Sequence, residues 1–271
     1  MFLPENIDLA HSESYDLSIR LTPDGFSFFI HSANDPSIFH FKETSLGSKF
    51  SYVENIKRLI FDLGFLSQPF HRTSVTVVSP KYTLVPDAFF ESKRVEEIAR
   101  YNFHQVEGSV HSDYLVSEKY HIVYLITREV HSFLTRSLWS PTFHHQASLL
   151  LPLFRSRSSE NDGRCCFVDF HDNHVSIACY NNANLLTTNM FPATHPRDTL
   201  YGIVSIWEKL AFDRSTDTLI LSGNPPHPEI VDELKELFPK VEQLHLELNT
   251  HVNEEQKRSL PTDILVKLCE S

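Results

Sequence analysis

Glycine is scarce in this sequence, with 7 residues among 271. Loops that hold phosphate groups commonly use several glycines, because a missing side chain lets the backbone amides approach the oxygens. With so few glycines in the whole sequence, we do not expect a glycine-rich phosphate-binding loop of that kind.

Long apolar runs and basic signals are also lacking. The longest apolar stretches, such as 149–154, fall well short of the roughly 18 residues that a membrane span needs. The first residues, 1–9, place no basic cluster before an apolar run, so they do not resemble a secretory signal. We therefore expect no membrane association and a cytoplasmic location.

Basic residues are outnumbered, with 24 Lys and Arg against 35 Asp and Glu and a net charge of −11. Binding to nucleic acid depends on dense Lys and Arg that neutralise phosphates, so we expect no nucleic-acid partner. The 4 cysteines have no CxxC spacing, and an adjacent pair rarely forms a disulfide without strain. Reduced, buried thiols are expected at Cys165, Cys166, Cys179 and Cys269.

Catalytic motifs are absent from the sequence as well. It contains neither the HExxH pattern of helical zinc sites nor the GxSxG turn of serine hydrolases. The composition is that of an ordinary globular chain, long enough for one large or two modest domains.

The same order of elements occurs twice along the chain. Alternating apolar residues predict a hairpin over 17–30 with a turn at Pro23-Asp24-Gly25, and a third strand near 38–41. A helical stripe over 49–63 ends before Gly64, and a β-branched strand follows at 74–79.

The second copy begins at Cys165. Strands are predicted at 165–170, 175–179 and 185–191, with a turn at 171–174, then a helix at 198–211 and a strand at 218–221. A helix over 228–238 and a strand near 241–246 complete it. The expected domains are a first lobe over 1–157 with an inserted segment near 80–140, a linker over 158–163 and a second lobe over 164–271.

This pattern resembles the actin-like ATPase superfamily of actin, sugar kinases, DnaK-type chaperones and pilus-assembly proteins. The resemblance depends on the 17–30 hairpin, on Val168-Asp169 and on the segment from Leu219 to Gly223. It implies an α/β fold of duplicated, ribonuclease H-like lobes, each with a mixed sheet of an antiparallel hairpin and parallel strands flanked by helices. Most closely, the chain is similar to an uncharacterised bacterial family with this fold.

The resemblance implies a nucleotide site that this sequence has altered. The first phosphate hairpin retains Gly25 alone, and the position of a metal-associated aspartate falls at Ile19 or Arg20. In the second hairpin Asp169 matches the acidic position, whereas residues 170–173 replace the glycines. If ATP with Mg²⁺ binds, the resemblance implies contacts from Gly25, Asp169, Asp172, Ser222 and Gly223.

A metal site is a different possibility. Asp169, His171, Asp172 and His174 lie within six residues, and imidazole with carboxylate suits zinc or a similar ion. Asp169 and His171 share one face of a strand, whereas Asp172 and His174 are expected in the turn. This reading would make the chain a metal-dependent hydrolase.

The leading hypothesis is a non-enzymatic scaffold without a cofactor. It would use its lobes to bind an unknown protein partner, with a homodimer as a possible form. An ATP-binding protein, ATPase or kinase is the first alternative, and the metal-dependent hydrolase is the second.

Overall fold

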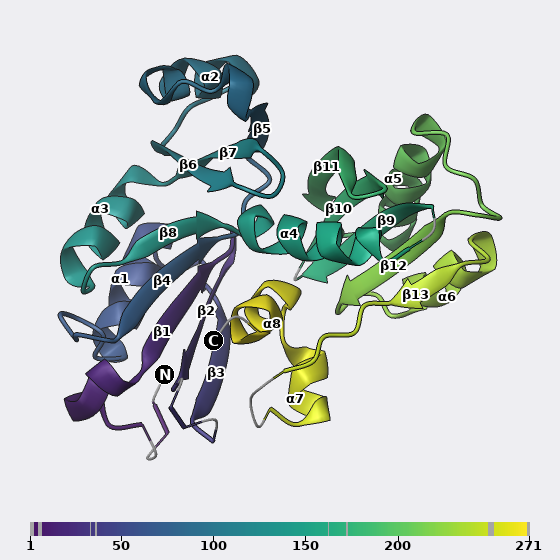
Figure 1. Cartoon of the computed structure of the whole chain (residues 1–271). Coiled ribbons are helices and arrows are strands. Elements are labelled where there is room, and N and C mark those ends of the chain that lie inside the picture. The colour runs from purple at the N-terminus through teal and green to yellow at the C-terminus, as the bar shows by residue number, and fades with distance from the viewer. Residues whose placement is uncertain are drawn as a thin grey trace. The chain divides into compact units, whose positions relative to one another are not determined.

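A computed structural model describes residues 3–4, 7–32, 34–35, 37–161, 163–171, 173–248 and 252–269. The chain divides into two compact units, Met1–Ser148 and Leu149–Ser271. Figure 1 labels the elements of both units.

The first unit contains a five-stranded mixed sheet in the order β3-β2-β1-β4-β8. The hairpin β1–β2 and strand β3 are antiparallel, whereas β4 and β8 run parallel to β1. The bounds are β1 Asp16–Leu21, β2 Gly25–His31, β3 Phe39–Ser45, β4 Arg72–Val77 and β8 Thr142–His145.

Helices α1 (Tyr52–Asp62) and α3 (Arg128–Ser137) cover one face of this sheet. Leu17, Ile19 and Leu21 alternate toward that face and pack with Ile56 of α1 and Leu134 of α3. Ser51 begins α1 with a capping box, in which its side chain accepts from the amide of Glu54. The alternate residues of β1 therefore face the opposite side of the sheet.

The inserted segment forms a three-stranded antiparallel sheet in the order β5-β7-β6. Its strands are β5 Tyr82–Pro86, β6 Ser109–Leu115 and β7 Tyr120–Ile126, and α2 spans Val95–Asn102. Short 3-10 helices in the insertion span Asp87–Phe89 and Ser92–Arg94. Another short 3-10 helix, Leu9–Ser14, lies before β1 and outside the insertion. Asp113 of β6 attaches the insertion to the larger sheet, since its carboxylate accepts from the amide of His145 at 2.7 Å.

The second unit contains another five-stranded mixed sheet, in the order β11-β10-β9-β12-β13. Its three antiparallel strands are followed by β12 and β13, which run parallel to β9. The bounds are β9 Arg164–His171, β10 His174–Asn181, β11 Asn184–Pro192, β12 Thr218–Gly223 and β13 Val241–Gln243.

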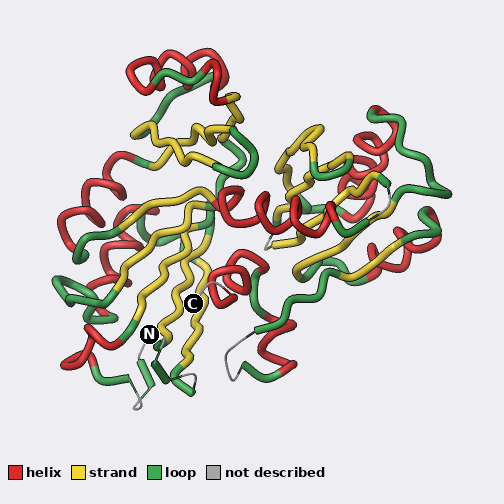
Figure 2. The backbone as a smooth tube through the Cα atoms, in the orientation of Figure 1, coloured by secondary structure: helices red, strands yellow, loops and turns green. Residues whose placement is uncertain are grey.

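Helices α5 (Pro196–Lys209) and α6 (Glu229–Leu237) pack on one face of the second sheet through Trp207 and Leu234. Helix α4 (Gln146–Ser159) packs on the other face, where Phe154 stacks on Phe167 with ring centres 4.6 Å apart. The chain continues into α7 (Glu254–Ser259) and α8 (Thr262–Cys269), and Figure 2 separates these helices from the strands by colour.

The predicted fold class is confirmed, because both sheets are mixed and flanked by helices. Some boundaries differ from the predictions. Helix α4 extends to Ser159, so the predicted linker over 158–163 begins within that helix. The sequence patterns also missed β5, α7 and α8.

Candidate functional site

The carboxyl ends of β9 and β12 are the candidate site in the second unit. Ligands of open α/β sheets bind beyond the carboxyl ends of parallel strands. Asp169 and Ser222 lie near those ends, and the register of the sheet places them directly opposite each other. The structure therefore brings together three of the predicted residues, Asp169, Ser222 and Gly223.

The Asp169 carboxylate is fully buried and accepts hydrogen bonds from other parts of the unit. Its Oδ1 atom accepts from the Ser222 hydroxyl at 2.7 Å and from the Thr262 hydroxyl at 2.5 Å. Thr262 is the first residue of α8, 93 positions along the chain from Asp169. A carboxylate oxygen has two lone pairs and can accept two hydrogen bonds. The Ser222 and Thr262 hydroxyls therefore occupy both acceptor positions of Oδ1.

Gly223 has a structural requirement of its own. Its φ is +70°, and a Cβ atom there would lie 1.9 Å from the Phe170 carbonyl oxygen. The same carbonyl accepts the amide of Asn224 at 3.1 Å, and the Asn224 side chain donates to the carbonyl of Arg258 in α7. Glycine is therefore needed here for close packing against β9.

The predicted turn between β9 and β10 is shorter than expected. β9 continues through His171 and β10 begins at His174, so His171 and His174 are strand residues, directly paired across the hairpin. The pairing of β9 with β10 extends to both histidines because core-facing and opposite-facing side chains keep alternating along both strands up to the turn. Asp172 lies outside the described residues.

His171 and Asp169 bond to different side chains. The Nε2 atom of His171 lies 2.9 Å from the Ser176 hydroxyl, whereas Asp169 accepts from Ser222 and Thr262. Within the described ranges, no group of three His, Cys, Asp or Glu side chains is arranged to hold a metal ion.

Gly25 belongs to the first unit, at the start of β2. The turn before it uses its backbone groups internally, because the Thr22 amide donates to the Gly25 carbonyl at 3.2 Å and Pro23 has no amide hydrogen. The Tyr52 hydroxyl of α1 donates to the Thr22 carbonyl at 3.0 Å, and burial raises the pKa of Tyr52. This turn therefore offers few free amides to a phosphate.

Arg20 takes the place in the first sheet that Asp169 has in the second. Ile19 and Leu21 pack in the core of the first unit, as Val168 and Phe170 do in the second. The polar residue between each pair faces the other side of its sheet. Of the two sequence candidates for the aspartate position, Arg20 is thus the counterpart, and its side chain is buried.

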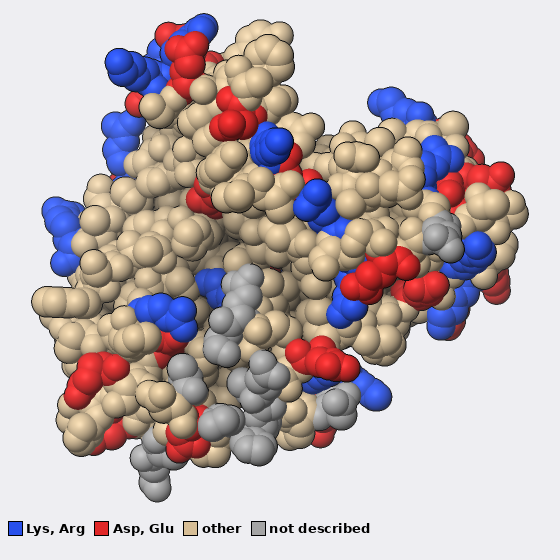
Figure 3. Space-filling model, viewed as in Figure 1, with Lys and Arg blue, Asp and Glu red and all other residues tan. Residues whose placement is uncertain are grey.

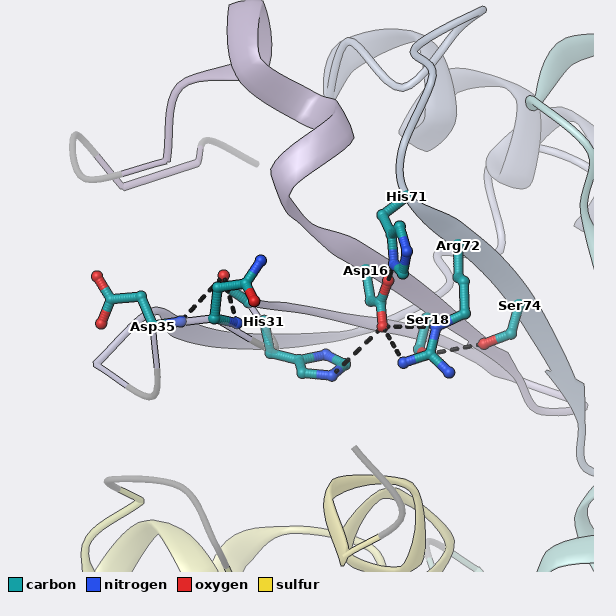
Figure 4. Close-up of polar contacts among 9 residues, drawn as sticks. Asp16, Ser18, His31, Asp35, His71, Arg72 and Ser74 are labelled. Atoms are coloured by element: carbon teal, nitrogen blue, oxygen red, sulfur yellow. Dashed lines mark hydrogen bonds and ion pairs between the residues drawn. The ribbon is translucent and has the colours of Figure 1, made fainter.

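A second polar cluster, which the sequence analysis missed, surrounds Asp16 at the start of β1 (Figure 4). The Arg72 guanidinium donates to Oδ2 of Asp16, with Nε at 2.9 Å, and Nδ1 of His71 lies 2.8 Å from Oδ1. His31, opposite Asp16 in the hairpin, places Nε2 3.7 Å from Oδ2. Burial raises the pKa of Asp16, but hydrogen bonds from Arg72 and His71 outweigh it and the net direction is downward.

The location of this cluster favours a structural role. Asp16 and Arg72 are the first residues of parallel strands β1 and β4, so the cluster lies at their amino ends. Ligand sites of α/β sheets lie at the opposite ends. Figure 4 shows His71 and Arg72 converging on Asp16 from the start of β4.

The cysteines are free thiols, and Cys165, Cys166 and Cys179 are buried as predicted, whereas Cys269 is partly exposed. Cys166 and Cys179 are directly opposed on β9 and β10 with sulfur atoms 3.4 Å apart, and both are buried in the core of the second unit. Burial raises the pKa of Cys165 to about 11, which disfavours a reactive thiolate.

Charged side chains of both signs are interspersed on the face shown in Figure 3. For example, on α2 Arg100 pairs with Glu96 at 3.0 Å. In the part of the chain that is described, no helix is long and apolar enough to cross a membrane.

Comparison with known proteins agrees with this architecture. A crystal structure of a Bacteroides thetaiotaomicron protein with an actin-like ATPase fold and unknown function superposes with a TM-score of 0.83, at 25% identity over 97% of this chain and 98% of that one. The PilM–PilN type IV pilus biogenesis complex gives a TM-score of 0.57 at 13% identity, over 95% of this chain and 97% of that one. A search of curated protein sequences found no match.

The family comparison covers most of the sequence. Residues 4–241 match the model of the family described as "Protein of unknown function (DUF3822)". With its two mixed sheets and the similarity to the Bacteroides structure, the chain is a member of this family and has the actin-like ATPase fold.

Proposed function

We propose that this chain is a non-catalytic actin-like protein whose nucleotide position is filled by its own side chains, and that it acts by binding another protein. The observation that carries the proposal is the buried Asp169 carboxylate, which accepts hydrogen bonds from Ser222 and Thr262. By the resemblance, this carboxylate would face the nucleotide. Here Thr262 of α8 contacts it instead.

The first sheet supports the same proposal. Arg20 stands where the resemblance implies a carboxylate associated with Mg²⁺. Mg²⁺ is bound through oxygen ligands, which a guanidinium does not supply. In the turn before Gly25, the Thr22 amide donates to the Gly25 carbonyl and is therefore not available to a phosphate.

The protein-binding role rests on analogy at the level of fold. PilM, which shares the fold, occurs in a complex with PilN. A cytoplasmic location and descent of the two sheets from one duplicated unit are further parts of the proposal. The shared strand order of the sheets supports the duplication.

The test is thermal unfolding with and without millimolar Mg-ATP or Mg-ADP. A ligand at one hundred times its dissociation constant stabilises the folded state by about 2.7 kcal/mol, which raises the unfolding temperature by several degrees. We expect no shift in the wild type or in Thr262→Ala, which removes a hydroxyl from Asp169.

The opposite result would restore the ATP-binding alternative. A shift in the wild type that disappears in Asp169→Ala but persists in Glu236→Ala, an exposed carboxylate of α6, would overturn the proposal. A separate titration with Zn²⁺ checks the metal alternative, for which stabilisation lost in His171→Ala would be the diagnostic result.

A further inference from the structure

Helices α1 and α3 of the first unit lie side by side and run in the same direction (Figure 1). The Nζ atom of Lys57 lies 5.9 Å from the centre of the Phe133 ring. Further along both segments, the amide of Ser67, beyond the end of α1, donates to the carbonyl of Ser137 at 2.8 Å. Residue numbers therefore rise together along the two helices, and their carboxyl ends are neighbours.

Two exposed aromatic side chains lie at this end of the helix pair. Phe61 is 70% exposed and follows Lys57 by one turn, so it lies on the same side of α1, toward α3. Trp139 is 59% exposed and lies two residues beyond the last residue of α3. Exposed large apolar side chains that gather in one place mark binding surfaces.

Two basic side chains accompany these aromatic residues. In the described part of the chain, neither Lys57 nor Arg136 forms an ion pair. Lys57 lies over the Phe133 ring, and the Arg136 guanidinium donates to a carbonyl of its own helix at 3.0 Å. Helix α2 is different, since Arg100 there pairs with Glu96. The charges of Lys57 and Arg136 are therefore not neutralised by a neighbouring carboxylate.

The acidic residues of the two helices lie elsewhere or are engaged by the backbone. Glu54, one turn before Lys57, is held by the capping box of α1. Asp62 follows Phe61 and lies about 100° further around the helix, away from α3. Glu129 is in the first turn of α3, at the opposite end. Positive charge therefore predominates beside the exposed aromatic rings.

We propose that the aromatic–basic surface, defined as Lys57, Phe61, Phe133, Arg136 and Trp139, binds a segment of a partner protein that carries carboxylates and apolar side chains. Aromatic side chains and arginine commonly provide most of the binding energy of an interface. Opposite charges guide the approach and fix the register. The inference rests on the proposed function, because it identifies the surface by which the chain would bind another protein.

An anionic membrane also attracts aromatic and basic side chains together. The chain has a net charge of −11, however, and a uniformly anionic membrane repels the rest of such a chain. An acidic segment of a protein contacts only the aromatic–basic surface, so its approach meets less repulsion. The observations therefore favour a protein segment over a membrane.

The test uses a fluorescent synthetic peptide that forms an amphipathic helix, with a leucine stripe flanked by glutamates and no tryptophan. Fluorescence anisotropy should show that the full chain binds this peptide and that added salt weakens the binding. The same peptide with lysine in place of each glutamate is the matched probe and should not bind. Cosedimentation with phosphatidylserine vesicles should leave the protein in solution.

Two substitutions locate the binding on the aromatic–basic surface. Phe61→Ser and Lys57→Glu should each weaken binding of the glutamate peptide by about tenfold or more. The matched controls are Tyr201→Ser, at an aromatic side chain that is 75% exposed, and Arg197→Glu, one turn earlier on α5. Both control variants should bind the peptide as the wild type does.

The wild type carries its own reporter, which decides the question if a variant does not fold. Of the 2 tryptophans, Trp207 is buried and Trp139 is exposed. Bound peptide should cover Trp139 and move the tryptophan emission to shorter wavelength. Binding that leaves the emission unchanged would place the contact elsewhere and overturn the proposal.

Three other results would also overturn it: no binding of the glutamate peptide, equal binding of the lysine peptide, or undiminished binding by both Phe61→Ser and Lys57→Glu. Binding to phosphatidylserine vesicles that is lost in Phe61→Ser would assign the surface to a membrane instead. The thermal test with Mg-ATP concerns the Asp169 site and not this surface, so the two proposals fail separately.

Discussion

Arg20 and Asp169 occupy corresponding places in the two sheets but carry opposite charges. Each is a buried residue on the first strand of its sheet, between two core residues. Arg20 lies opposite Ser27 and Thr76, and Asp169 lies opposite Ser176 and Ser222. The comparison shows that strand order and hydroxyl neighbours are shared while the central charge is not.

The hydroxyl neighbours are used differently in the two sheets: Ser222 donates to Asp169, whereas the Ser27 hydroxyl opposite Arg20 is buried without a hydrogen-bond partner among the described residues. A serine or threonine hydroxyl can donate to a carboxylate or accept from a guanidinium. The same strand arrangement can therefore hold either residue, and topology alone does not determine the chemistry at this position.

The largest difference between the sheets should appear at their glycines. Gly223→Ala should lower the free energy of unfolding by about 3 kcal/mol, because φ is positive and the new Cβ would overlap the Phe170 carbonyl. Gly25→Ala should cost about 1 kcal/mol or less, since its Cβ would meet the movable Thr22 hydroxyl at 2.6 Å. Urea unfolding measures both, and equal losses would contradict the comparison.

Removing the Asp169 carboxylate should have the next largest effect. Asp169→Ala leaves the hydroxyls of Ser222 and Thr262 without this acceptor, at a cost of about 2 to 3 kcal/mol. Asp169→Asn keeps an acceptor oxygen in nearly the same shape and should lose about half as much. Chemical denaturation of the two variants checks this order, and an alanine variant as stable as the asparagine variant would show that these bonds contribute little.

The Asp16 cluster predicts a dependence on pH that is specific to the first sheet. Because the folded pKa of Asp16 is lowered, its contribution is present above the unfolded pKa of about 3.9 and is lost as pH falls through the folded value. At neutral pH, Asp16→Asn should cost about 1 kcal/mol, since Arg72 and His71 are 59% and 60% exposed and solvent weakens their pairing.

The measurement is urea unfolding at neutral pH and in steps below about pH 5. The wild type should lose more stability than Asp16→Asn over the acidic steps, so that the two curves converge. Curves that remain parallel would show that Asp16 titrates alike in the folded and unfolded states.

A similarly small effect is expected from removing the α8 contact alone. Thr262→Val removes one hydroxyl from Asp169 while nearly keeping the shape, and should cost about 1 kcal/mol. Thr262→Ser retains the hydroxyl and is the control. A valine variant more stable than the serine variant would indicate that packing at this position outweighs the hydrogen bond.

Strand and helix positions in both sheets were predictable because their apolar residues alternate or recur with helical spacing. Phe26, Phe28 and Ile30, for example, are buried on one face of β2 as the pattern indicates. β5 and α7 are short, and α7 contains no apolar residue, so periodicity could not identify them.

The candidate site was predictable only in part. The register between Asp169 and Ser222 follows from the two parallel strands, and the resemblance singled out both residues. The contact from Thr262 joins residues far apart in the sequence, so no local pattern indicates it. The Asp16 cluster also joins the ends of three strands, although His71 and Arg72 lie within three residues of the strand predicted over 74–79.

The close approach of Gly223 to Phe170 has a consequence for motif-based annotation. A glycine at the end of β12 is commonly taken to make room for a nucleotide, yet here its positive φ and the close approach of β9 require it. A pattern search that scores such a glycine as evidence of ATP binding would therefore return false positives among chains with this backbone. Scoring the residues that surround the acidic position would separate them better.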